Sequence, residues 1–384
     1  MNRSVPPTPA ARRCASALPT LLLAALLAAN PAAARPPVID VHVHTDPSHY
    51  GDVLEVLAAT GVTRFVNLSG GSVGDGLEEA LDGAAPYDRR VLVCANVRWR
   101  EYAASDFGEK QAAALAEAAR LGAACLKIPK VLGLGLPDPD RPDHYMAVDD
   151  ARLDPIWAAA GRLGLPVFIH TSDPKAFWEP VTPANERYAE LSVHPGWSFA
   201  GPEFPSRETL LAQRDHLLEK HLGTIFVGVH LANNPEDLDY VDRTMAAHPN
   251  LWVDVSARVP EIGRHDPAKA RALFVKYQDR VLFGTDLGFG RQLMLGSVGA
   301  NRPNIADLFL FYADIFRFFE TRDRSIPHPT PIQGDWRIDA IGLPEDVLVK
   351  LYLTNALRLL WHEAGPSAVD REALEQARPL SSFF

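Results

Sequence analysis

The chain has 384 residues, of which 47% are hydrophobic and 22% charged, a composition typical of a globular protein rather than a disordered or fibrous one. Its 38 basic and 48 acidic residues give a formal net charge of −10 at pH 7. This charge argues against nucleic acid or an anionic membrane as a partner. The length suffices for one large domain or two ordinary ones.

The amino terminus has the pattern of a secretory signal peptide. Three arginines precede an apolar run at 21–29, and Ala32 and Ala34 are placed for cleavage after a small residue. The run is far shorter than the roughly 20 residues of a membrane-spanning helix, so we expect no membrane anchor. We predict that residues 1–34 are a signal peptide and that 35–384 form an exported protein, periplasmic or secreted. The general secretory and twin-arginine routes both stay open.

Short runs of strand-forming residues alternate with helical patterns along the rest of the chain. The expected strands lie at 38–44, 63–69, 91–99, 123–128, 166–171, 224–230, 251–257 and 281–286. The expected helices between them include 109–122, 152–164, 206–221, 235–249 and 267–278. This alternation over about 250 residues predicts a (β/α)8 TIM barrel. A doubly wound sheet is disfavoured, because no glycine-rich phosphate-binding turn follows the first strand.

The segment after residue 287 does not have the pattern of a second domain. It contains helical patterns at 305–320 and 344–361 within a long final loop. We therefore predict one catalytic domain over 35–384, with the last helix completing the outer ring of the barrel.

Once the leader is removed, Cys94 and Cys125 are the two remaining cysteines, and both lie in strand-like runs. Two cysteines do not make a disulfide framework. We predict two buried free thiols, with a bridge as the alternative in an oxidising compartment.

The first expected strand, VIDVHVHTD at 38–46, combines apolar and polar side chains. Successive side chains of a strand point to opposite faces, so we expect Asp40, His42 and His44 to share one face. A buried polar face is costly unless something satisfies it. This raises the question of what binds there.

Later strands end in similar residues. His170, His230 and Asp286 end the fifth, sixth and eighth expected strands. The functional residues of such barrels gather at the carboxyl ends of the strands, so these three should converge with His42 and His44. Neutral imidazole and carboxylate are good ligands for zinc and similar divalent ions. We therefore predict a metal site at this mouth, and we expect the histidines in helices and other loops to lie at the surface.

Further residues at the expected mouth are weaker candidates for substrate binding. They are Lys127, Arg98, Trp178, Asn233 and His49. Arg98 suits a carboxylate, because its planar fork makes two parallel hydrogen bonds. Asp254 and Ser256 point the same way on the seventh strand and are expected to support the metal-binding residues.

Four segments and the final helix together resemble those of a known family. The four segments are DVHVH at 40–44, FIHTSD at 168–173, VGVHLANN at 227–234 and LFGTD at 282–286. The chain resembles the amidohydrolase superfamily, and more closely its amidohydrolase-2 branch, which includes aminocarboxymuconate-semialdehyde decarboxylase-like proteins. By that resemblance His42, His44, His170 and Asp286 hold the metal. His230 is then a further ligand, or positions the substrate and its reacting water.

The resemblance implies a metal-dependent hydrolase, in which a metal-activated water attacks an amide, ester or lactone carbonyl. Asp286 would accept the proton of this water. The alternative is a metal-dependent, non-oxidative decarboxylase of an aromatic or unsaturated acid, and an inactive metal-binding barrel is disfavoured. The substrate is expected to be a small molecule of unspecified identity, and homo-oligomer formation stays open.

The same resemblance implies a divalent metal cofactor, zinc with manganese as the alternative, and one ion per chain is favoured over two. The role of Lys127 decides whether the chain binds one metal ion or two. It would be carboxylated and bridge two ions, or bind a substrate carboxylate, or be neutralised by Asp286.

Overall fold

The computed structural model describes residues 35–300, 302–377 and 383. The predicted signal peptide at 1–34 lies outside the described residues. Pro36–Phe384 form one unit, in agreement with the single domain expected from the sequence. Within the described part of the chain, none of the helices combines the length and apolarity that a membrane crossing needs.

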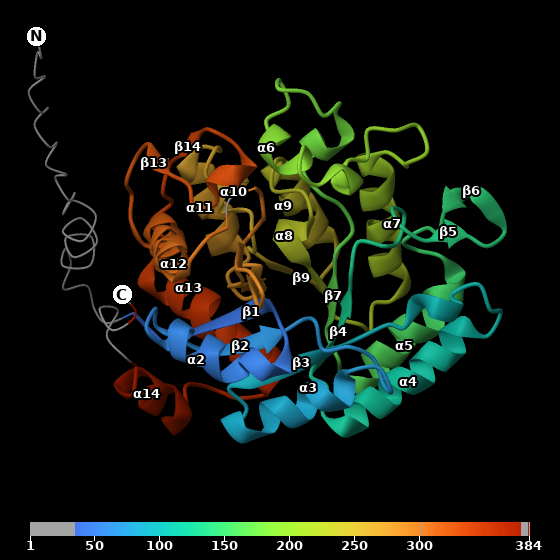
Figure 1. Ribbon diagram of the computed structural model, residues 1–384, viewed down its shortest axis with the longest axis horizontal. Coiled ribbons are helices and arrows are strands. Elements are labelled where there is room, and N and C mark those ends of the chain that lie inside the picture. Colours follow the sequence, from blue (N-terminus) through green and yellow to red (C-terminus); the bar gives the residue numbers. More distant parts are fainter. Residues whose placement is uncertain (1–34, 301, 378–382, 384) are drawn as a thin grey trace, which may run out of the picture. The chain divides into compact units, whose positions relative to one another are not determined.

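Parallel strands form the wall of a closed barrel, as the sequence predicts (Figure 1). The eighth segment of the wall is divided, so that β10 pairs with β9 and β11 pairs with β1. Backbone hydrogen bonds from Val41 N to Phe283 O and from Asp286 N to His42 O, both 3.0 Å, complete the seam. The strands of the wall are β1 (Val38–Thr45), β2 (Val62–Asn67), β3 (Val91–Asn96), β4 (Cys125–Ile128), β7 (Val167–Ile169), β8 (Phe226–Gly228), β9 (Leu251–Asp254), β10 (Val281–Leu282) and β11 (Leu287–Phe289).

Helices cover the outside of this wall, and their ends follow the expected signals. Gly122 ends α4 with a φ of 114°, which a glycine adopts without steric cost. The Ser206 side chain accepts a hydrogen bond from Thr209 N at the start of α7. The outer helices are α2 (Tyr50–Ala58), α3 (Leu77–Ala84), α4 (Phe107–Leu121), α5 (Asp154–Leu163), α7 (Arg207–Lys220), α9 (Leu238–Ala247), α11 (Pro267–Lys276) and α12 (Ile305–Glu320).

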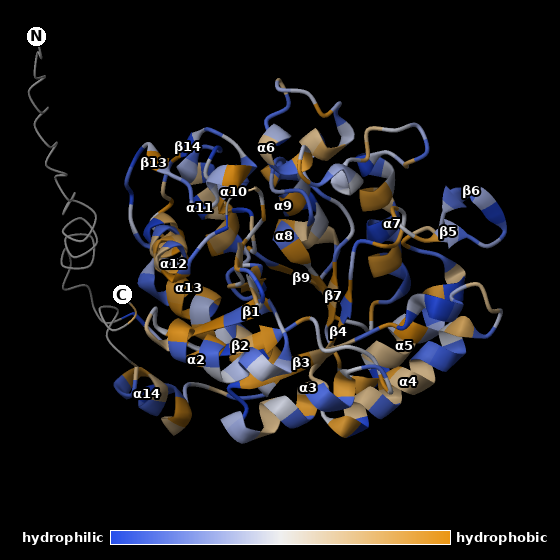
Figure 2. Ribbon diagram, viewed as in Figure 1, coloured by the Kyte–Doolittle hydropathy of each residue, from blue (hydrophilic) through white to orange (hydrophobic). Residues whose placement is uncertain are grey.

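The buried apolar side chains divide into two clusters, one on each side of the wall. The outer cluster joins the strands to the helices, for example through Leu57, Trp157 and Phe274. The inner cluster fills the barrel. In Figure 2 the strands are mostly orange, the colour of hydrophobic residues, while the peripheral hairpin strand β6 is blue, the colour of hydrophilic ones. The inner cluster draws on every strand of the wall except β11: Ile39, Val41, Val66, Leu68, Leu92, Cys94, Cys125, Phe168, Val227, Val229, Trp252 and Leu282.

The last helical segment closes the amino end of the barrel. It begins with α13 (Glu345–Val349) against the outer ring and continues as wider turns to Trp361. The Asn355 side chain donates to Gln278 O and Val281 O at the start of β10, and Trp361 Nε1 donates to Arg89 O before β3. Leu353, Leu357, Leu360 and Trp361 join the inner cluster. The helix therefore forms a floor as well as completing the ring.

Long loops extend from the carboxyl ends of the strands, where a site is expected. Tyr145 after β4 stacks on Phe204 after β7 with ring centroids 5.3 Å apart, so two of these loops pack together. The smaller elements, most of them in these loops, are β5 (Pro137–Asp138), β6 (Arg141–Tyr145), α6 (Tyr188–Leu191), α8 (Val229–Ala232), α10 (Val259–Ile262), β12 (Met294–Leu295), β13 (Ile326–Pro327), β14 (Arg337–Ile338) and α14 (Ala368–Glu375).

One feature of β1 differs from expectation. The register with β2 shifts between Asp40 and Val43, so Asp40 does not share a face with His42. The Asp40 carboxylate accepts hydrogen bonds from Thr285 Oγ1 at 2.5 Å and from Tyr312 of α12 at 2.6 Å. Burial raises the pKa of Asp40 to about 6. Asp40 therefore ties the first strand to the last strand and its helix, outside the histidine cluster.

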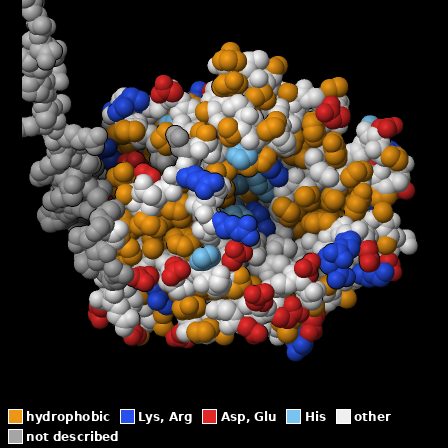
Figure 3. Space-filling view, viewed as in Figure 1, with side chains coloured by type: hydrophobic (Ala, Val, Ile, Leu, Met, Phe, Trp, Pro, Cys, Tyr) orange, Lys and Arg blue, Asp and Glu red, His pale blue; other side chains and the backbone are white. Residues whose placement is uncertain are grey.

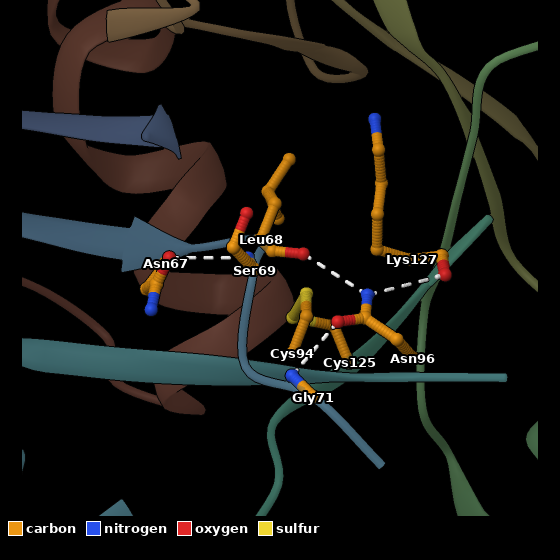
Figure 4. Close-up of a disulfide and its surroundings, with 8 residues drawn as sticks. All are labelled: Asn67, Leu68, Ser69, Gly71, Cys94, Asn96, Cys125 and Lys127. Atoms are coloured by element: carbon orange, nitrogen blue, oxygen red, sulfur yellow. Dashed lines mark hydrogen bonds between the residues drawn. A yellow bond between two sulfur atoms is a disulfide. The ribbon is translucent and has the colours of Figure 1, made fainter. Parts of the chain in front are cut away.

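The prediction of free thiols is wrong, because Cys94 and Cys125 form a disulfide (Figure 4). The two residues are register partners on β3 and β4, with Cα atoms 4.4 Å apart. Strand register brings them together, and the separate sequence runs do not reveal it. Figure 4 shows the bridge beside Asn96, and both cysteines belong to the inner cluster.

Candidate metal centre

Two histidines and an aspartate converge at the carboxyl end of the barrel. Asp286 Oδ1 lies 3.4 Å from Nε2 of His42 and 3.4 Å from Nε2 of His44. One ligand atom from each residue lies within 4.8 Å of the others. His42 is buried, whereas the Asp286 side chain is 18% exposed and the His44 side chain 30% exposed, so the group is reachable from the mouth. This donor set fits a divalent ion.

Each of three histidines uses its Nδ1 atom for a hydrogen bond within the protein. His42 Nδ1 lies 2.8 Å from Asp254 Oδ2, and His44 Nδ1 lies 2.7 Å from Ser69 Oγ. His230 Nδ1 lies 2.9 Å from the backbone oxygen of Ser256. When Nδ1 donates in this way, Nε2 carries the lone pair and the ring orientation is fixed, as in metal-binding histidines.

Asp254 is the buried anchor of this network. Its Oδ1 atom accepts from His230 N at 2.8 Å and from Ser256 Oγ at 2.6 Å. Burial alone would raise the pKa of Asp254, but the adjacent His42 and the hydrogen bonds hold it below its ordinary value. His42, His230 and Asp254 are also close enough to form a second potential ligand group. Because the hydrogen bonds already engage Asp254, the residue supports the histidines, as expected.

The backbone at this end of the barrel is unusual. Ten non-glycine residues of the described chain have a positive φ, and six of them lie in the segments after β8, β9 and β10. They include Asp286 with a φ of 63° and the run from His230 to Asn233. Such conformations cost of order 1 kcal/mol each, and they concentrate where a side chain must be aimed.

His170 lies in the same cluster but outside the group formed by His42, His44 and Asp286. Its ring centroid is 4.5 Å from that of His230. Its Nε2 atom lies 3.2 Å from Asp173 Oδ1, so its Nδ1 atom remains free of that contact. Burial lowers the pKa of His170 to about 4. The ring is therefore neutral at pH 7.

Among the residues that the structure describes, Lys127 is the one buried lysine. Its side chain is 4% exposed, and its Nζ atom has no hydrogen-bond partner in the described structure. Figure 4 shows the side chain extending away from the disulfide. Burial lowers the pKa of Lys127 to about 8, against the opposing effect of Asp254 and Asp286. The ammonium group therefore lies near both carboxylates without a direct bond to either.

Two of the weaker candidates are used elsewhere in the fold. The Trp178 indole donates to Pro205 O and packs on Phe199. Asn233 accepts from Thr171 N through its amide oxygen and donates to Ser172 O through its amide nitrogen, so its side chain fixes the loop after β7.

The other two candidates are more accessible. His49 lies beside Phe289, which follows Asp286 by three residues, and its side chain is 34% exposed. Arg98 is exposed after β3, and among the described contacts none brings its guanidinium to the histidines. Of the histidines expected at the surface, His248 at the end of α9 and His328 are instead buried.

Sequence reasoning missed Arg258. This residue follows β9 by four positions, is 6% exposed, and places Nη2 3.5 Å from Asp173 Oδ1. Its position after a strand of the wall was the available signal. Figure 3 shows histidine and basic side chains gathered in a hollow of this face.

Comparison with solved structures supports the same fold. A TIM-barrel protein from Bordetella bronchiseptica matches 84% of this chain and 98% of its own, with a TM-score of 0.50 and 16% identity. The 2,6-dihydroxybenzoate decarboxylase from Rhizobium matches 85% and 99%, with a TM-score of 0.50 and 14% identity.

A family model provides the stronger match. No curated protein matches the chain in sequence. The model of the amidohydrolase family, in its amidohydrolase-2 branch, matches residues 39–360. This range includes the barrel wall from Ile39 onward and every candidate residue of the mouth. The resemblance seen in the sequence is therefore confirmed, and the chain belongs to the amidohydrolase family.

Proposed function

We propose that this amidohydrolase-family enzyme is a metal-dependent hydrolase of a small molecule with an amide, ester or lactone bond. One observation carries the proposal: a single oxygen of Asp286 faces Nε2 of both His42 and His44 at 3.4 Å. We infer that His42, His44 and Asp286 hold one divalent ion, zinc with manganese as the alternative, and that His170 completes the set. The acidic chain is not suited to nucleic acid.

The bound ion would supply a Lewis acid that polarises a carbonyl and makes water acidic enough to react near neutral pH. The residues of the chain have separate tasks. Asp286 accepts a proton through its carboxylate and passes it to the leaving group. His230, held by Ser256, presents Nε2 toward the substrate and orients it.

A decarboxylase is the second candidate, and Lys127 favours it. An ammonium group buried without a partner is costly, and a substrate carboxylate would satisfy it. In that reaction the acid would lie against Lys127, while Asp286 or His230 would deliver the proton to the carbon that loses carbon dioxide.

A substrate panel separates the two reactions. Wild-type protein loaded with zinc or manganese is incubated with esters, lactones and amides, and in parallel with hydroxybenzoates while carbon dioxide is measured. Hydrolysis without carbon dioxide release supports the first proposal, and release without hydrolysis overturns it. The D286N variant serves as the background control for both assays.

We also propose that the protein is exported after cleavage near residue 35. The disulfide supports this, because such bonds persist mainly in oxidising compartments. Fractionation of a bacterial host followed by amino-terminal sequencing tests it. An uncleaved protein confined to the cytosol would contradict the proposal.

A further inference from the structure

The backbone of Asp286 depends on support from its surroundings. Its φ of 63° places a non-glycine residue in the left-handed region, which costs of order 1 kcal/mol. Two hydrogen bonds hold it there: Asp286 N donates to His42 O at 3.0 Å, and Gly296 N donates to Asp286 O at 3.3 Å. Such a conformation persists only where neighbouring contacts define it. The residues that fix this segment therefore help to determine where the Asp286 carboxylate points.

Asp40 joins this segment to the first strand. Its Oδ1 atom accepts hydrogen bonds from His42 N at 3.0 Å and from Thr285 N at 3.1 Å. Its Oδ2 atom accepts from Thr285 Oγ1 at 2.5 Å. The side chain is fully buried, and hydrogen bonds to an ionised carboxylate are stronger than those between neutral groups. One carboxylate thus links the backbone of His42 to the residue directly before Asp286.

The two linked segments also pack closely against each other. A Cβ atom at Gly284 would lie 2.9 Å from the Cβ atom of His42, so a larger residue would require the chain to move. A shift of residues 284–286 would therefore change the spacing between His42 and Asp286.

The last member of the network comes from α12. Tyr312 OH donates to Asp40 Oδ2 at 2.6 Å and lies 3.2 Å from Thr285 Oγ1. Its side chain is fully buried, and its ring centroid lies 5.7 Å from that of Phe311 and 6.1 Å from that of Phe316. The packed ring holds the hydroxyl group in one place, so α12 helps to fix the carboxylate of Asp40.

We propose that Tyr312 is a positioning residue for Asp286, acting through Asp40 and Thr285. The contacts run from the hydroxyl group of the helix to a buried carboxylate, and from there to the backbone beside both His42 and Asp286. Removing a hydrogen bond that orients a metal ligand typically lowers metal affinity or activity by roughly 10–100-fold. The inference rests on the proposed function for the assignment of Asp286 as a metal ligand, but it applies to hydrolysis and decarboxylation alike.

The Y312F variant of the full chain tests the proposal, because it removes one hydroxyl group and keeps the ring. We expect zinc affinity, measured by competition with a chelating dye, to fall about tenfold. The absorption bands of protein loaded with cobalt(II) should shift, because they report the geometry of the ligands. With the substrate found in the panel, kcat should fall and KM should change little, since Asp286 transfers the proton and does not bind the substrate.

Tyr352 provides a matched control from the same aromatic cluster. Its ring centroid lies 5.6 Å from that of Phe316, and its hydroxyl group donates to Glu320 Oε1 at 3.1 Å. Y352F therefore removes a phenolic hydrogen bond to a different acceptor. It should keep zinc affinity, the cobalt spectrum and kcat close to those of the wild type. The melting temperature of each variant is measured, so that a change in stability is separated from a change at the metal centre.

A double-mutant cycle tests the route through Asp40. If Tyr312 acts through that carboxylate, adding Y312F to D40N should lower zinc affinity much less than Y312F does alone. T285V removes the second hydroxyl group and should weaken zinc binding, whereas T285S keeps the hydroxyl group and should preserve most of it. This pair covers the case in which D40N folds poorly.

Equal zinc affinity and an equal cobalt spectrum in Y312F and wild type overturn the inference, and so does an equal loss in Y352F. Full additivity of Y312F and D40N overturns the route through Asp40.

The outcome is distinguishable from failure of the proposed function. If Y312F weakens zinc binding but the wild type turns over neither hydrolysis nor decarboxylation substrates, the reaction proposal fails alone. If the wild type binds zinc and turns over a substrate while Y312F matches it, the positioning proposal fails alone. If the wild type binds no metal, the assignment of Asp286 as a ligand fails and this inference fails with it.

Discussion

The two ends of the barrel both bury charged residues, but they satisfy them differently. At the amino end, Arg64 of β2 makes two hydrogen bonds to Asp370 and others to Glu363 and Ser367. At the carboxyl end, Lys127 has no partner and Arg258 has one hydrogen bond. Both sites exclude most solvent, so burial alone does not explain the contrast.

The difference indicates where the protein is built to bind something. A buried charge with a full set of hydrogen bonds contributes to the fold, while a buried charge with free donors costs stability until a ligand arrives. Most of the strained backbone lies at the same end, after β8, β9 and β10. Changes at the floor should therefore affect stability, and changes at the mouth should affect activity.

The largest effect is expected at Asp286. Replacing it with asparagine keeps the shape but removes the carboxylate that accepts the proton, so kcat should fall by roughly a thousandfold. Steady-state kinetics on the substrate found in the panel measures this. D242N, on the outer helix α9, should keep kcat within about twofold, as distant surface changes do. Wild-type kcat in D286N would remove Asp286 from the mechanism.

At the amino end of the barrel, we expect a substitution to lower stability and leave kcat unchanged. R64M leaves the Asp370 and Glu363 carboxylates without their cation, which should lower the free energy of unfolding by about 3–5 kcal/mol. Denaturant unfolding measures the loss, and kcat of the folded fraction should not change. A stable R64M variant with low kcat would contradict the account, because it would mean that Arg64 serves activity rather than stability.

Acid titration provides a control for the same network. Burial would raise the pKa of Asp370, but hydrogen bonds from Arg64 hold it below the ordinary 3.8. The stabilisation from a lowered pKa is complete above 3.8 and is lost as the pH falls below it. Wild-type stability should therefore drop below about pH 4, and R64M should lack this part of the drop.

The disulfide lies between the two ends and should act on stability. Its cysteines are 31 residues apart, and closing a loop of this size contributes about 4 kcal/mol. The C94A/C125A double variant should lose about that amount in denaturant unfolding. Unchanged stability would mean that the bridge does not form in solution, which a thiol assay on unfolded protein checks independently.

The smallest change in stability is expected at Lys127, where the substitution should raise stability rather than lower it. K127M replaces a buried, unpartnered ammonium with an apolar group, so the metal-free protein should gain about 1–2 kcal/mol of stability. Turnover should fall at least tenfold. K269M, on the exposed face of α11, should change neither by much. Lower stability in K127M would mean that Lys127 stabilises the fold, as Arg64 does, and is not held ready for a ligand.

The sequence predicts the fold and most of the mouth, because both follow from periodicity. Alternating strands and helices predict the barrel, and the rule that strand ends carry function brings His42, His44, His230 and Asp286 together. The α12 helix has the bounds expected from its helical pattern at 305–320. These features depend on residues close together in the chain.

The corrections arise where contacts between distant segments decide the outcome. The shift in β1 that turns Asp40 away from His42 depends on pairing with β2. The bridge of Cys94 to Cys125 depends on the register of two strands. Arg258 was missed because its contact with Asp173 joins the segment after β9 to the loop after β7, and the sequence does not show which distant segments meet.

Metal content of the purified mature protein is the most direct test of the candidate centre. Plasma mass spectrometry should find about one divalent ion per chain in the wild type, and less in an H42A/H44A variant that still folds. Two ions would add a bridging role for Lys127. If the wild type contains no metal and takes up neither zinc nor manganese, the assignment of His42, His44 and Asp286 is contradicted.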